Sequence, residues 1–296
     1  MSVNSLSPSM GTTSCVLDDD TIARIALACA GVSGDPTVAI GINILGGPVA
    51  FVAAVHDGRD RPVALSHLVR QRIRALASAK RVADVLRSMS RNGGHVLTPR
   101  DVQWPSQLSA LRRSAPLVLF AQGDMAVLEL PAVAITGTAD PTAGAIHMTI
   151  ELATGLADRR WVIASGMTQG VDQLSLSAAA AMRGRTITVA AEGLLGTEVV
   201  DGSVRISESP PTNAVTVRGQ HRAKQLLAAI ATKTIVVEAG KSSGALRTAE
   251  AAISMNRPVG TVAQTSMSKT AAGSIDLHLR HSMVRIASVK DADRLR

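Results

Sequence analysis

Short, wholly apolar runs alternate with longer amphipathic stretches over the C-terminal two thirds of the chain. The runs are rich in β-branched residues and span 132–137, 161–166, 186–191, 234–239 and 258–263. Such runs are typical of strands that are covered on both faces. Stretches with helical periodicity lie between them, at 143–158, 171–183, 220–231 and 245–256. This alternation predicts an α/β fold with a doubly wound, mostly parallel sheet.

The first third of the chain follows a different pattern, in which apolar residues recur at helical spacing and glycine and proline separate the segments. Asp18 to Asp20 can cap a first helix that ends at Gly34-Asp35-Pro36, and a second helical stretch covers 37–44. Ser66 opens a long helix to about Ser90. We therefore predict three regions, which are a flexible N-terminus (1–17), a small all-helical domain (18–94) and the α/β domain (95–290).

The net charge of +8 and the pI of about 10.4 indicate a basic surface, which attracts polyanions such as nucleic acids. An arginine-rich composition without any such role is the alternative. The chain has no tyrosine, and its only aromatic residues are Phe51, Phe120, Trp104 and Trp161. Stacking on aromatic rings is the usual way to hold unpaired bases, so we expect little of it here.

Localisation signals are absent from the sequence. The two cysteines, Cys15 and Cys29, have neither metal-ligand nor CxxC spacing, which favours reduced thiols. No basic stretch followed by an apolar run marks a signal peptide, and no segment has the length and apolarity of a membrane helix. We expect a cytoplasmic protein that does not bind membranes.

Three glycine-rich loops follow predicted strands, at 137–141, 165–172 and 238–249. In doubly wound sheets, ligands bind where such loops enter helices at the carboxyl ends of strands. Glycine lets the backbone approach a phosphate, and the free N–H groups of a helix start attract anions. The sequence therefore predicts a phosphate-binding rim formed by these three loops.

Catalytic motifs are not complete anywhere in the chain. Lys241 and Ser242 resemble the end of a Walker A motif, but Ile235 stands where the first glycine belongs. The histidines have no metal-ligand spacing, so we expect no metal and no cofactor. Asp172 and Glu238 could form an acid–base pair. The alternative is structural, in which Asp172 braces the turn behind Gly170 and Glu238 accepts backbone N–H groups.

Basic residues gather where the helix at 220–231 begins, and two more lie in the third loop. Arg218, His221, Arg222 and Lys224 form the first group, which we consider a candidate DNA contact beside the rim. The arginines and lysines of the long helix at 66–90 are interpreted as a solvated face. The candidate binding residues are Gly137, Thr138, Ser165, Gly166, Gly170, Asp172, Arg218, Arg222, Lys224, Glu238, Lys241, Ser243, Gly244 and Thr248.

The loops resemble motifs of the DNA-processing protein A (DprA/Smf) family. VIASGMTQGVD (162–172) is similar to its "vvSGlArGiD" motif, and the run at 235–262 is similar to "lVVEA…SGsLiTA..A…gRpVfaV". The segments 98–124 and 206–211 match two further motifs in the right order. The likeness covers nearly all of residues 20–265, and 31–36 resembles actinobacterial members in particular.

The resemblance implies a Rossmann-like domain that binds single-stranded DNA, dimerises, and passes the strand to a RecA-type recombinase during DNA uptake, with no catalytic activity. Four basic family positions are replaced here, by Ala139, Gln169, Ala223 and Gln225. Two alternatives therefore stay open. One is a nucleotide- or phosphate-binding Rossmann module that has lost DNA binding, and the other is a nucleotide hydrolase of related architecture.

Overall fold

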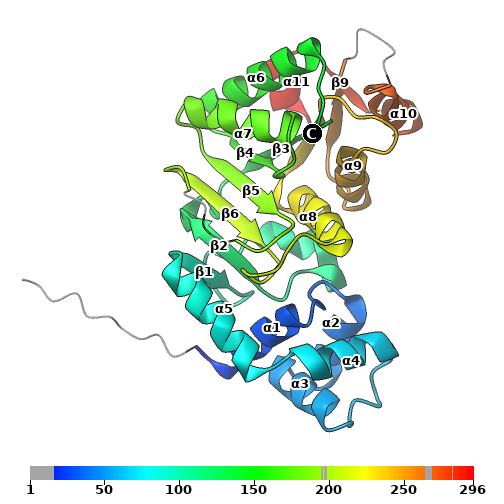
Figure 1. Cartoon of the computed structure of the whole chain (residues 1–296). Coiled ribbons are helices and arrows are strands. Elements are labelled where there is room, and N and C mark those ends of the chain that lie inside the picture. Colours follow the sequence, from blue (N-terminus) through cyan, green and yellow to red (C-terminus); the bar gives the residue numbers. More distant parts are fainter. Residues whose placement is uncertain (1–16, 195, 197–198, 264–268, 282) are drawn as a thin grey trace, which may run out of the picture.

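The computed structural model describes residues 17–194, 196, 199–263, 269–281 and 283–296. Five helices come first, and an α/β unit follows (Figure 1). Asp18 caps the first helix, since its carboxylate accepts the N–H of Thr21 at 2.8 Å. The five helices are α1 (Asp19–Cys29), α2 (Pro36–Ile44), α3 (Pro48–His56), α4 (His67–Leu76) and α5 (Ala79–Arg91).

The described residues form one nine-stranded sheet, in the order β1-β2-β6-β5-β4-β3-β7-β8-β9. The pairs β1–β2 and β2–β6 are antiparallel, and all other neighbours are parallel. The strands are β1 (Gly94–Leu97), β2 (Leu119–Gly123), β3 (Ala132–Thr136), β4 (Val162–Ser165), β5 (Thr186–Ala190), β6 (Ser203–Ser207), β7 (Lys233–Val236), β8 (Val259–Val262) and β9 (Val284–Ile286). The predicted doubly wound, mostly parallel sheet is confirmed.

Helices cover both faces of this sheet, and the alternation of side chains along β3 decides which residue meets which layer. Ala132 and Ala134 belong to the apolar cluster under η1 (Ser106–Ser114), η2 (Met125–Glu129) and α8 (Val217–Ile230). Val133 and Ile135 face the opposite cluster. That cluster lies under α6 (Ala143–Asp158), α7 (Val171–Ala181) and α11 (Val289–Arg294), while α9 (Gly244–Ser254) and α10 (Ala272–His281) flank β7 and β8.

The helical segment packs against the sheet through a shared apolar core. Ile25, Phe51 and Ile73 are completely buried there, in the same cluster as Phe120 of β2 and Ala190 of β5. The sequence-predicted boundaries at 17/18 and 94/95 stay predictions. Residues 1–16 of the predicted flexible N-terminus lie outside the described residues.

Two sequence predictions differ from the structure. The long helix expected at 66–90 is two helices, because Ala77 leaves the helical conformation and the Ser78 hydroxyl accepts the N–H of Arg81 to begin α5. Four strands were not expected, namely β1, β2, β6 and β9. β6 has the sequence SVRIS. Its polar residues interrupt the apolar pattern expected of a strand, although every position is buried.

Hydropathy gives no single membrane-crossing helix within the described ranges. The helices α2 and α3 together reach the required length and composition, but the chain bends by 99° between them. Both contribute buried residues to the core that the helical segment shares with the sheet, including Val38 and Phe51.

Candidate nucleic-acid interface

The strand order reverses between β3 and β7, and the first and third loops leave the sheet at this point. β4, β5 and β6 follow on one side of β3, and β8 and β9 follow on the far side of β7. The Thr138 N–H donates to the Glu238 carbonyl at 2.7 Å, which fastens the two loops together. The crevice above such a reversal is the usual ligand site of doubly wound sheets.

The second loop is held by a buried polar network. Asp172 is only 1% exposed, and its carboxylate accepts the Thr136 hydroxyl at 2.8 Å and the Lys224 ammonium at 3.3 Å. Gly166 packs directly on this ion pair, since a Cβ there would lie 2.6 Å from Asp172 Oδ2. Ser165 is fully buried and donates to the Ile135 carbonyl at 2.6 Å. These residues join β4, α7 and α8 to the end of β3.

Gly170 connects the second loop with the first. Its φ is +81°, a conformation that side chains disfavour. A Cβ at this position would also lie 2.4 Å from the Thr138 carbonyl oxygen and 2.5 Å from that of Ala139. The next residue, Val171, donates its N–H to the Thr138 carbonyl at 3.1 Å. Only glycine fits this contact between the loops.

Glu238 braces the start of α6. One carboxylate oxygen accepts both the N–H and the hydroxyl of Thr142 at 3.0 Å, and the other accepts the Thr270 hydroxyl. Glu238 is fully buried. Its carboxylate bonds α6 and the segment before α10, whereas the carboxylate of Asp172 bonds Thr136 and Lys224. The structural reading of both carboxylates fits these bonds, although Glu238 bonds the loop after β3 rather than the loop that follows it in sequence.

A cavity of about 880 Å³, here called the central cavity, lies above the strand reversal. All three loops line it, together with the segment that leads into α8. Its cationic side chains are Lys224, Arg247 and Lys269, and His221 adds a further nitrogen donor or acceptor. The other lining residues include Thr138, Ala139, Gly166, Met167, Thr168, Glu192, Gln220, Ser242, Ser243 and Gly244. Glu192 is the only carboxylate among the described lining residues.

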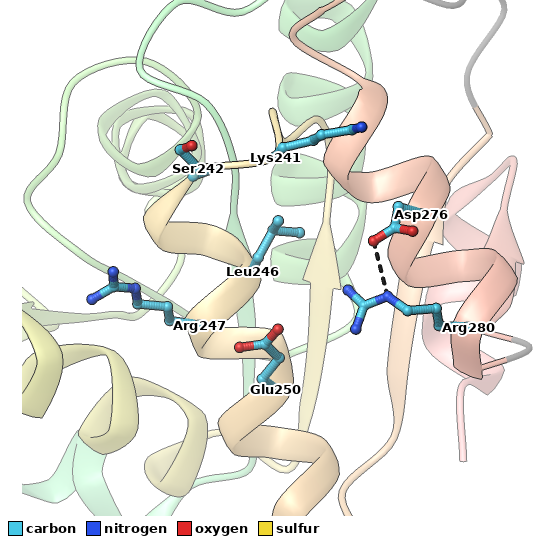
Figure 2. A pocket seen from close by; sticks show the side chains of 8 residues that line it. Lys241, Ser242, Leu246, Arg247, Glu250, Asp276 and Arg280 are labelled. Carbon is cyan, nitrogen blue, oxygen red and sulfur yellow. Dashed lines mark hydrogen bonds and ion pairs between the residues drawn. The ribbon is translucent and has the colours of Figure 1, made fainter.

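The third loop separates the central cavity from a second hollow of about 450 Å³ beside α10. Figure 2 shows Lys241 pointing toward α10, whereas Arg247 points away from it. Arg247, Ser242 and Ser243 line both hollows. Arg280 is bound to Asp276 at 2.9 Å, so Lys241 and Arg247 are the cations near the start of α9 that this ion pair leaves available.

Arg222 holds parts of the fold together. Its guanidinium forms a bidentate ion pair with Glu208, at 2.8 and 2.6 Å, and donates to the Ser114 carbonyl and to Gln225 Oε1. It also packs against Gly34 of the helical segment. Since 11% of the side chain is exposed and its donors are engaged, Arg222 clamps the helices to the sheet. Arg218 is exposed, and among the described residues its guanidinium reaches only the Ser33 carbonyl, at 3.5 Å.

The sequence-predicted residues therefore fall into two groups. Those that line the central cavity are Gly137, Thr138, Gly166, Lys224, Ser243 and Gly244, while Lys241 lines the neighbouring hollow beside α10. Those that hold the scaffold are Ser165, Gly170, Asp172, Arg222, Glu238 and the fully buried Thr248, while Arg218 lies on the other side of α8. Sequence reasoning did not single out Lys269 or Gln220, because neither belongs to a recognisable motif. Met167 was also missed, although it lies within the motif at 162–172, because an apolar side chain gives no signal for phosphate binding.

Arg205 of β6 lies behind the second loop. Its guanidinium reaches the Met167 sulfur at 3.5 Å, and Nη1 has no hydrogen-bond partner. Burial lowers the pKa of Arg205, and the Glu192 carboxylate acts in the opposite direction. Over the part of the chain that the structure describes, no three histidine, cysteine or carboxylate side chains come together as a metal site.

The sequence is similar to a known protein family and to several of its members. Residues 95–292 match the family of DNA recombination-mediator protein A, so the match continues beyond residue 265, where the sequence motifs end. A Mycobacterium tuberculosis chain named as a DNA processing protein DprA is 32% identical over 271 residues, which cover 83% of this chain and 67% of that one. The DNA processing protein DprA of Bacillus subtilis is 29% identical over 204 residues, covering 65% and 68%.

Two solved structures have the same fold. DprA from Streptococcus pneumoniae superposes with a TM-score of 0.77 at 19% identity, covering 95% of this chain and 99% of its own. DNA processing protein A from Helicobacter pylori, for which a unique single-stranded DNA binding mode is described, superposes with a TM-score of 0.60 at 23% identity. That match covers 67% of this chain and 94% of the H. pylori protein.

Proposed function

This chain belongs to the DNA recombination-mediator protein A family, and we propose that it binds single-stranded DNA in the central cavity without catalysing a reaction. The observation that carries the proposal is the convergence of three glycine-lined loops on one cavity with Lys224, Arg247 and Lys269 in its wall. Loop and helix-start N–H groups would bind phosphates there, and the cations would supply the salt-dependent attraction.

The four positions at which family arginines are replaced are compatible with DNA binding if other cations make the contacts. Ala139 lines the central cavity, where its small side chain leaves space but adds no positive charge. Gln225 accepts a hydrogen bond from Arg222, which an arginine at 225 could not do. Val215 and Val217 are 49% and 70% exposed at the cavity wall, so aliphatic side chains are available to contact bases where aromatic rings are lacking. We propose that Arg247 and Lys269 contribute the cationic contacts of the central cavity, with Lys241 in the neighbouring hollow beside α10.

Titration of a labelled single-stranded oligonucleotide across a salt series tests the proposal. We expect binding that weakens steeply with salt, by about 0.7 in the slope of log K against log salt for each phosphate contact. Arg247→Gln should remove one such contact, whereas Arg183→Gln, at an exposed position just after α7, serves as the matched control. Salt-insensitive binding of a free nucleotide, with no oligonucleotide binding, would favour a nucleotide-binding module instead.

Catalysis is not part of the proposal, because Asp172 and Glu238 are engaged in separate buried networks. Incubation of labelled DNA or nucleoside phosphates with the protein should leave them intact, and a hydrolysis product that disappears in Asp172→Asn would contradict this. We also propose a homodimer that passes DNA to a RecA-type recombinase in the cytoplasm, which rests on the family alone. Light scattering and co-sedimentation with a recombinase test these two points.

A further inference from the structure

A further cationic hollow lies on the other side of α8, between the helical segment and the sheet. It has a volume of about 440 Å³, and we call it the junction pocket. Arg72 of α4, Arg81 of α5 and Arg218 of α8 line it, together with Arg222 and Glu208. The pocket thus brings guanidinium groups from the neighbouring helices α4 and α5 together with those of α8, which is far from them in the sequence.

The charges of the junction pocket do not balance. Glu208 is the only carboxylate among its described lining residues, and it is already paired with Arg222. Within the described chain, the guanidinium groups of Arg72 and Arg81 make no hydrogen bond or ion pair, and that of Arg218 reaches only the Ser33 carbonyl. Like charges around one hollow repel each other, so an anion that enters it is stabilised by all three.

The junction pocket adjoins the central cavity. Ala191 and Ala223 line both, and the first turns of α8 separate them. Thr216 caps this 14-residue helix by accepting the N–H of Gly219 at 2.9 Å. The N–H groups of Val217 and Arg218 precede the first intrahelical bond, which Gln220 makes to Thr216, and are the donors that a helix start presents to anions.

We propose that the junction pocket is a second phosphate-binding site for the same single strand, which crosses the start of α8 from the central cavity and continues between the sheet and the helical segment. The inference rests on the proposed function. The ligand is a phosphodiester chain rather than a free phosphate, because one polyanion can neutralise the cations of the central cavity and of the junction pocket at once. The helical segment then contributes directly to binding through Arg72 and Arg81.

Oligonucleotide length separates the two sites. Binding of homothymidine strands of about 6 and about 24 nucleotides to the full chain would be measured by anisotropy across a salt series, since compact single-strand-binding folds cover about 4–16 nucleotides. In Arg72→Gln/Arg81→Gln, the long strand should lose about 1.4 in salt slope and bind several-fold more weakly, while the short strand is unaffected. The matched control is Arg59→Gln/Arg87→Gln, which removes two exposed arginines outside both hollows.

Each outcome decides between the two proposals. If wild type binds neither strand, both the proposed function and this inference fail. If wild type binds both strands but the Arg72/Arg81 variant loses nothing relative to its control, only the second site is overturned. Equal losses for both strands would also overturn it. Loss of stabilisation by inorganic phosphate in the Arg72/Arg81 variant, without any effect of strand length, would identify a free phosphate ligand and reject the strand. Thermal unfolding would verify that both variants are folded.

Discussion

The central cavity and the junction pocket flank the same turns of α8, but their charges are arranged differently. In the central cavity the cation Lys224 is bound to the buried Asp172. In the junction pocket Arg72 and Arg81 have no acidic partner within the described residues. Six of the fourteen sequence-predicted residues hold the scaffold, whereas Arg72 and Arg81 of the junction pocket, unpaired in the described chain, lie outside the quoted motifs. A sequence motif can therefore locate a binding surface without naming the groups that bind.

The largest effect is expected from removing the ion pair of Arg222 and Glu208, both of which line the junction pocket. Arg222→Met leaves Glu208 buried without a partner, so we expect the free energy of unfolding to fall by about 3–5 kcal/mol. Urea denaturation would measure it. Arg222→Met/Glu208→Gln removes both charges and should recover a large part of the loss. A loss below about 1 kcal/mol would show that Arg222 is free to bind ligand rather than engaged in the fold.

Much of the fold could be predicted from the sequence, and the reasons are local. α6 begins and ends where the pattern places it, because Thr142 caps an amphipathic stretch that follows an apolar strand. β6 could not be predicted, since the buried Arg205 interrupts its apolar pattern. The break at Ala77 also has no strong local signal, because neither glycine nor proline marks it.

The site was predictable as a place but not as a set of side chains. The rule that loops at the carboxyl ends of strands form the ligand site correctly brings Thr138, Gly166 and Ser243 together. The functions of Arg222 and Arg72 depend on tertiary contacts. Arg222 meets Glu208, which is distant in sequence, and Arg72 comes from a helix that was interpreted as a solvated face.

The loop layer of the central cavity depends on one backbone conformation. Gly170→Ala places a Cβ against two carbonyl oxygens at positive φ, so we expect a loss of about 2 kcal/mol or more in the free energy of unfolding. Gly144→Ala is the matched control, because a Cβ there meets nothing within 4 Å and α6 should gain about 0.5–1 kcal/mol. Equal effects of the two substitutions in thermal or urea unfolding would contradict the close contact of the first two loops.

The wall of the junction pocket contains a titratable group whose effect is smaller. Burial raises the pKa of the Cys29 thiol from 9.0 to about 11. The thiol therefore contributes stability that is present below pH 9 and is lost as the pH rises toward about 11, because the unfolded state releases the proton first. Between about pH 8 and pH 9.5 we expect wild type to lose on the order of 1 kcal/mol more than Cys29→Ala.

Urea unfolding of both proteins at several pH values would measure this difference. Cys15→Ala, compared in the same way, controls for the general effect of losing one thiol. Parallel pH profiles for wild type and Cys29→Ala would mean that water reaches the thiol, and the junction pocket would then be more open at its base than the 7% exposure of Cys29 indicates.

The smallest expected effect distinguishes Lys224 from Arg247 as the side chain that contacts the ligand. Lys224 lines the central cavity, but its charge is balanced by Asp172 at 3.3 Å, whereas Arg247 has no ion pair among the described residues. Replacing the buried pair by Lys224→Met/Asp172→Asn should change the salt slope of oligonucleotide binding by less than Arg247→Gln does. The latter should lower the slope by about 0.7, or roughly 2–3-fold in affinity change between 50 and 200 mM salt. Thermal unfolding would show that the double variant is folded, and a larger slope change in it than in Arg247→Gln would mean that Lys224 leaves Asp172 to bind phosphate.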